Sequence, residues 1–84
     1  MTSRTVTDTT EQAFVDRMLT RPIVQGSHYA ATCTRKGGIT VRRTKSGRLI
    51  YSAKYRVTAP LHKPATFSSR TTVDGRIVAR KVAR

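Results

Sequence analysis

The segment from Ile39 to Val57 reads ITVRRTKSGRLIYSAKYRV, and it carries the clearest structural pattern in the chain. From Leu49 to Val57 every second side chain is apolar, which is the period of a β-strand with one buried face. Ile39 and Val41 alternate with polar residues in the same way, and the linker between the two runs contains Gly47, the residue type that a hairpin turn needs for positive φ. The segment therefore predicts one antiparallel β-hairpin.

The predicted hairpin has two chemically different faces. One face carries Tyr51 and Tyr55, whereas the opposite face carries Arg42, Lys54 and Arg56 with hydroxyl side chains between them. No carboxylate occurs between residues 39 and 57. A sheet face of this kind attracts a polyanion, because no neighbouring charge neutralises it.

The charge of the whole chain indicates the same kind of partner. The 84 residues include 17 Lys and Arg but only 4 Asp and Glu, which gives a net charge of +13. Asp8, Glu11 and Asp16 all precede Arg17, so we expect a partner, rather than intramolecular salt bridges, to neutralise the bases that follow. Arginine outnumbers lysine by more than two to one, and its planar guanidinium suits bidentate binding of phosphate or carboxylate.

Length and residue types exclude several classes of protein. A chain this short has room for one domain with a small core. Its single cysteine, Cys33, excludes an internal disulfide. No apolar run approaches the roughly 20 residues of a membrane-spanning helix, so no membrane partner is expected. The N-terminal residues contain no hydrophobic segment that could act as a secretion signal. The expected location is therefore cytoplasmic, or inside a virus particle.

The N-terminal part of the chain predicts a flexible arm followed by a helix. Residues 1–8 lack a burial pattern and form the arm, and residues 9–84 form the single basic domain. The helix is expected from Thr9 to Thr20, with Asp8 or Thr9 as its cap and Pro22 ending it. Its apolar stripe is expected to pack on the tyrosine face of the hairpin and consists of Phe14, Val15, Met18 and Leu19.

A further strand is expected before the hairpin. Residues from His28 to Arg35 place Tyr29, Ala31 and Cys33 on one face, and Lys36-Gly37-Gly38 would then turn the chain into the hairpin. The result is a three-stranded antiparallel meander. The two glycines also allow a backbone to approach phosphate, as anion-binding loops do, but a plain turn is favoured because the chain lacks P-loop spacing.

The C-terminal part predicts a second hairpin. Thr58 to Pro64 is a connection, and Asp74-Gly75 is a hairpin signal between residues 65–73 and 76–82. Residues 76–82 alternate imperfectly and also fit a short helix. The predicted fold class is α+β, in which an N-terminal helix packs on the three-stranded meander and the C-terminal hairpin can close the sheet into a small five-stranded barrel.

The sequence contains few of the side chains that catalysis requires. His28, His62 and Cys33 are the only residues of their types, and they show no metal-ligand spacing. A pair formed by Cys33 and His28 is a weak candidate nucleophile, since a small core cysteine explains Cys33 better. We therefore expect a protein that is not an enzyme and that has no cofactor, no catalytic residues and no metal site.

These observations together favour a small protein that binds DNA or RNA through the phosphate backbone. Backbone contact is favoured over base stacking, because the aromatic rings mostly occupy positions that a core would require. The residues expected at the interface are Arg35, Lys36, Arg42, Lys45, Arg48, Lys54, Arg56, Arg80, Lys81 and Arg84.

Two alternatives use the same basic surface. The chain could be a virus- or phage-type accessory or inhibitor protein that docks on an acidic host protein. It could also be a basic structural component of a virion or a ribonucleoprotein. Net charge alone does not separate these from nucleic-acid binding, because each partner presents an acidic surface.

Overall fold

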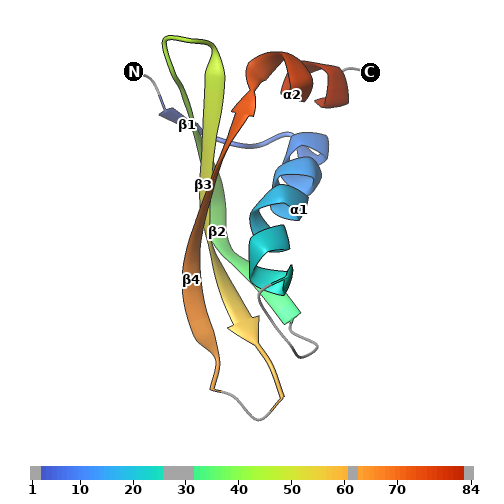
Figure 1. The fold of residues 1–84 in the computed structure, drawn as a ribbon, viewed down its shortest axis with the longest axis vertical. Helices are drawn as coiled ribbons and strands as arrows, with labels where there is room; N and C mark the ends of the chain where they lie inside the picture. Colours follow the sequence, from blue (N-terminus) through green and yellow to red (C-terminus); the bar gives the residue numbers. More distant parts are fainter. Residues whose placement is uncertain (1–2, 26–31, 61–62, 83–84) are drawn as a thin grey trace.

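The computed structural model describes residues 3–25, 32–60 and 63–82, and it has the expected α+β class (Figure 1). Four strands form one open antiparallel sheet in the order β1-β2-β3-β4, and both helices lie on the same side of it. The elements in chain order are β1 (Ser3–Thr5), α1 (Thr9–Gln25), β2 (Thr32–Arg43), β3 (Arg48–Thr58), β4 (Ala65–Asp74) and α2 (Gly75–Val82).

The core lies between the sheet and the helices. Leu49 and Tyr55 are buried on the helix side of β3, as the alternation predicts. Val15 and Leu19 bring the apolar stripe of α1 onto this face, and Val78 adds a contact from α2. A small core of this kind depends on every large side chain in it, because the apolar area that the domain buries is limited.

The central hairpin is present, but the strand before it differs from the prediction. β2 runs without a turn through Lys36, Gly37 and Gly38, so the predicted turn at these residues is wrong. Lys36 pairs with Lys54 and Thr40 pairs with Ser52, which places three residues of β2 opposite one residue of β3. The glycines therefore form a bulge, in which Gly37 has a φ of 80°. The predicted start of this strand, residues 28–31, lies outside the described residues.

The prediction of a C-terminal hairpin is also wrong, because β4 pairs with β3 and the chain then forms the helix α2. Asp74 explains the difference. Its Oδ1 accepts a hydrogen bond from the backbone N–H of Arg76 at 2.8 Å, which is the interaction of a helix N-cap. The sheet consequently ends at β4 and stays open, so the expected three-stranded meander and five-stranded barrel are replaced by a four-stranded open sheet.

The structure also differs from the prediction in the N-terminal arm and in the position where the helix ends. Ser3–Thr5 forms β1 against β2, and Val6 is buried, so this part of residues 1–8 belongs to the domain. Asp8 caps α1 as expected, because its Oδ1 accepts the N–H of Glu11 at 2.9 Å. The helix continues through Pro22 to Gln25. Ile23 packs against the core, and this burial compensates for the hydrogen bond that a helical proline cannot donate.

Candidate nucleic-acid interface

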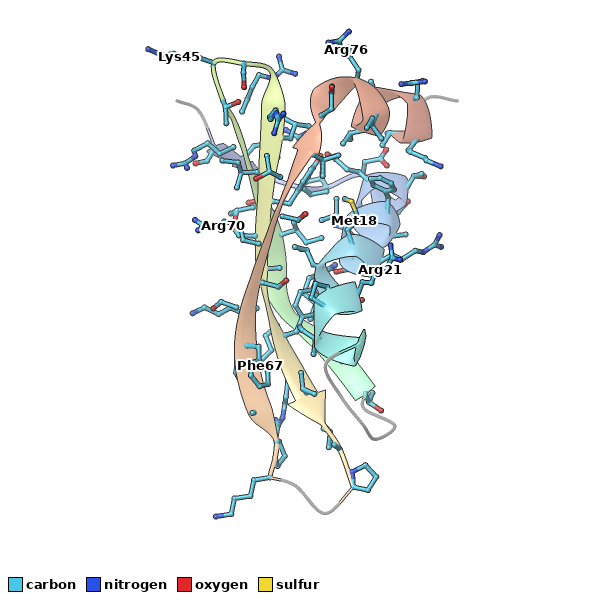
Figure 2. The ribbon with its side chains drawn as sticks, in the orientation of Figure 1. Met18, Arg21, Lys45, Phe67, Arg70 and Arg76 are labelled. Carbon is cyan, nitrogen blue, oxygen red and sulfur yellow. The ribbon has the colours of Figure 1, made fainter. Side chains whose placement is uncertain are left out.

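The sheet face opposite the two helices, here called the open face, is basic. No described element covers it, and Figure 2 shows Arg70 pointing away from α1 and α2. Residues directly opposite one another in neighbouring strands point to the same side of a sheet, so the strand register assigns each side chain to a face. The exposed bases that this register places on the open face are Lys36 and Arg42 of β2, Arg48, Lys54 and Arg56 of β3, and Arg70 of β4, with Arg48 at the end of the sheet opposite Asp74.

Hydroxyl side chains lie between these bases. Thr40 Oγ1 and Ser52 Oγ are 3.0 Å apart and form a hydrogen bond across β2 and β3. A depression of about 580 Å³ lies over β2, β3 and β4 on the open face. Its side-chain lining combines cations and hydroxyls and includes Lys36, Thr40, Ser52, Lys54, Ser68 and Arg70. Both groups donate hydrogen bonds to anionic oxygens.

Two carboxylates of α1 lie on the opposite, helix side of the sheet. Glu11 is only 5 % exposed and accepts hydrogen bonds from the Tyr51 hydroxyl at 2.6 Å and from Arg4 Nη2 at 3.2 Å. Burial, followed by this hydrogen bond to a carboxylate, raises the pKa of Tyr51 far above its ordinary value. The carboxylate therefore serves to join α1 to the sheet and does not face the basic residues of the open face.

Asp16 repeats this arrangement farther along the helix. It accepts a hydrogen bond from the Tyr55 hydroxyl at 2.6 Å and forms an ion pair with Arg35. Burial and the hydrogen bond to Asp16 raise the pKa of Tyr55 as well. Arg35 was predicted at the interface, but it lies on the helix side and its charge is paired. The expectation that internal salt bridges cannot absorb the charge is therefore wrong at this residue.

The remaining predicted interface residues separate into groups. Lys36, Arg42, Lys54 and Arg56 come together on the open face. Lys45 and Arg48 lie at one end of the sheet, at the β2–β3 turn and at the start of β3, where Arg48 is opposite Asp74. Figure 2 shows Lys45 at this end. Arg80 and Lys81 are exposed on α2, away from the open face. Arg84 lies outside the described residues.

Arg70 is the basic residue of the open face that sequence reasoning missed. It pairs with Ser52 in the register of β3 and β4 and lines the depression. Residues 68–72 read SSRTT and are all polar, so alternation in the sequence could not assign Arg70 to a face. Its neighbour could not be identified, because Asp74-Gly75 suggested that residues 65–73 paired with the segment after them.

The described residues contain no group of three or more His, Cys, Asp or Glu side chains that could hold a metal ion. Within residues 3–25, 32–60 and 63–82, neither helix is long and apolar enough to cross a membrane. Comparison of the chain with protein-family models, curated proteins and solved structures found no significant match.

Proposed function

We propose that this protein binds nucleic acid by placing the open face of its sheet against the phosphate backbone. One observation supports this most directly, namely that basic side chains of three strands gather on the uncovered side of the sheet, away from the carboxylates of α1. Lys36, Arg42, Lys54, Arg56 and Arg70 share the uncovered side, while Glu11 and Asp16 are engaged on the helix side. Asp74, opposite Arg48 at the end of the sheet, is the acid that the described strands place on this side. A predominantly basic surface raises the local concentration of a polyanion.

Phosphate contact fits the surface better than base stacking does. Tyr51 and Tyr55 are buried in the core, with their hydroxyls bonded to carboxylates. Phe67 is 49 % exposed, but it pairs with Tyr55 in the register and therefore lies on the helix side. The described part of the open face thus presents no aromatic ring to a base. Arginine, lysine and hydroxyl groups hold a phosphate backbone without specifying its sequence.

A salt-dependent titration against duplex DNA, single-stranded DNA and structured RNA tests the proposal. Binding that neutralises about five phosphates of duplex DNA gives a log–log salt slope near −4.5, because each neutralised phosphate releases condensed counterions. Removing one phosphate contact with Arg42→Gln or Arg56→Gln reduces the magnitude of the slope by about 1.

Matched controls lie on the outer side of α1. Arg17 and Arg21 are exposed, and Figure 2 shows Arg21 pointing away from the sheet. Arg17→Gln and Arg21→Gln remove the same charge as the test variants and are expected to leave affinity almost unchanged. Equal losses from all four variants would mean diffuse attraction instead of a defined interface.

The alternative partners need a separate measurement. A pull-down from lysate treated with nuclease retains an acidic protein partner and loses nucleic acid. The accessory-protein or structural alternatives would be favoured over the proposed function by two results together. None of the three nucleic acids would bind in the titration, and one acidic protein would be captured through Arg42 and Arg56.

A further inference from the structure

Lys36 and Lys54 stand directly opposite one another across β2 and β3. Both side chains are exposed on the open face, and both line the depression there. Like charges in directly opposed positions of an antiparallel pair repel each other and destabilise the sheet. Two lysines at this pair of positions therefore weaken the isolated protein unless an anion lies between them.

The acidic side chains of the described residues do not supply that anion. Asp8 caps the start of α1 on the helix side of the sheet. Glu11 and Asp16 are on the helix side, where each is bonded to a tyrosine and an arginine. Asp74 is in β4, six residues from Ser68, which pairs with Lys54. At a rise of about 3.3 Å per residue this separation is roughly 20 Å. The charged residue of β4 that is nearest to Ser68 in the strand is Arg70, a third cation that lines the same depression.

The glycine bulge shapes the site beside the lysine pair. Gly38 lines the depression, and Gly37 has the positive φ that lets β2 bend at this point. A bulge bends its strand and changes the direction of the side chains beside it, which here include Lys36. The hydrogen-bonded hydroxyls of Thr40 and Ser52 border the same depression. Cations from three strands and ordered hydroxyl groups are thus brought together around one hollow.

We propose that this depression is a binding site for a phosphate group, held between Lys36 and Lys54 with Arg70 as a third cationic contact. The phosphate could belong to a nucleic-acid backbone, in which case the inference rests on the proposed function, or to a free phosphate compound. In both cases the anion removes the repulsion between the lysines. The site therefore couples phosphate binding to stability through two named residues, Lys36 and Lys54, whereas a diffuse basic surface would spread the effect over many residues.

The test uses the full chain with pyrophosphate as the free-phosphate probe and a blunt DNA duplex without terminal phosphates as the backbone probe. Both are titrated at fixed ionic strength, with chloride as the reference anion, while amide NMR shifts and the melting temperature are recorded. Pyrophosphate is expected to shift the amides of residues 36–40, 52–54 and 68–70 and to raise the melting temperature.

Lys36→Gln and Lys54→Gln are the test variants, and Lys45→Gln at the exposed β2–β3 turn is the control. Each test variant is expected to raise the melting temperature of the ligand-free protein, because it removes the repulsion. Each is also expected to weaken pyrophosphate binding by about two- to fivefold, the range for loss of one exposed charge contact. Lys45→Gln should change neither quantity. A gain in stability together with a loss of affinity is a result that a merely structural role would not give.

The outcomes separate this site from the proposed function. The site is overturned, and the proposed function still stands, if Lys36→Gln and Lys54→Gln leave duplex binding unaffected and pyrophosphate shifts no amide signals at these residues. Pyrophosphate binding that needs both lysines, with no binding of the duplex, supports the site with a free phosphate compound as its ligand and counts against the proposed function. Unchanged or lowered melting temperatures of both ligand-free variants overturn the inferred repulsion.

Discussion

Tyr51 donates a hydrogen bond to Glu11 across the interface between sheet and helix, with 2.6 Å between Tyr51 Oη and Glu11 Oε2. Four residues along β3, Tyr55 makes the equivalent bond to Asp16 of α1, also at 2.6 Å. These two bonds hold α1 over the tyrosine face at points five residues apart along the helix. The opposite face is left uncovered, so the position of the helix determines which face of the sheet can bind a partner.

Tyr51→Phe is expected to destabilise the protein by about 1.5–3 kcal/mol, the range for a hydrogen bond to a charged group. Tyr55→Phe is expected to cost less, because the Asp16 side chain is 35 % exposed and water can replace the lost donor, whereas the Glu11 side chain is 7 % exposed. Urea unfolding monitored by circular dichroism measures both free energies. A larger loss for Tyr55→Phe would show that burial of the acceptor does not control the effect.

Stability is expected to fall as the pH rises above about 10. Burial and the hydrogen bonds to Glu11 and Asp16 raise the folded-state pKa of Tyr51 and Tyr55 above the ordinary value of 10.0. The unfolded chain therefore loses the tyrosine protons first, so this contribution is fully present below pH 10 and declines above it. Urea unfolding between pH 8 and 12 measures the slope. The double variant Tyr51→Phe/Tyr55→Phe should have a smaller decline, and an equal decline in the variant would assign the effect to lysine titration.

Leu49 and Ile50 provide a matched pair for the assignment of the two sheet faces. Leu49 is buried in the core, whereas its neighbour Ile50 lies on the open face and is only partly buried. Leu49→Ala is expected to destabilise by about 2–4 kcal/mol, because it leaves a cavity. Ile50→Ala should cost less than about 1 kcal/mol. Thermal unfolding compares them, and a reversed order would mean that the faces are exchanged.

Residue alternation was sufficient to predict the central hairpin and the two faces of β3. Tyr51 and Tyr55 were assigned to the core, and Lys54 and Arg56 to the opposite side, because a strand's period of two leaves only two possible assignments. The start of α1 could also be predicted from local sequence, since Asp8 lies three residues before Glu11, the residue whose N–H its side chain accepts. These features depend on neighbours in the sequence.

The remaining features depend on contacts between distant residues. Asp74-Gly75 and Gly37-Gly38 are turn signals in the sequence, yet one pair begins a helix and the other forms a bulge within a strand. Glycine permits both structures, and the pairing of β4 with β3 selects between them. The same pairing places Arg70 on the open face, so this member of the candidate site could not be assigned until the sheet order was known.

At Gly75, α2 starts beside the β2–β3 turn. Its backbone N–H donates to the carbonyl oxygen of Gly47 at 3.2 Å, and a Cβ added at Gly75 would lie only 2.8 Å from that oxygen. Any side chain there must push α2 away from the turn and loosen the packing of Val78, the residue of α2 that is buried in the core. Gly75→Ala is therefore expected to destabilise by about 1–3 kcal/mol, the range for overpacking a close contact. Amide hydrogen exchange is expected to speed up first in α2.

Gly47 supplies the control, because it is sensitive to substitution for a different reason. It has a φ of +86°, but an added Cβ would meet nothing within 4 Å. Gly47→Ala should cost about 1–2 kcal/mol from the left-handed backbone alone, and Gly47→Asn should recover part of that loss, because asparagine tolerates this conformation. Gly75→Asn should recover nothing relative to Gly75→Ala, since its Cβ meets the same oxygen. If asparagine rescued Gly75 as well, backbone conformation and not the close contact with Gly47 would be what requires glycine at the start of α2.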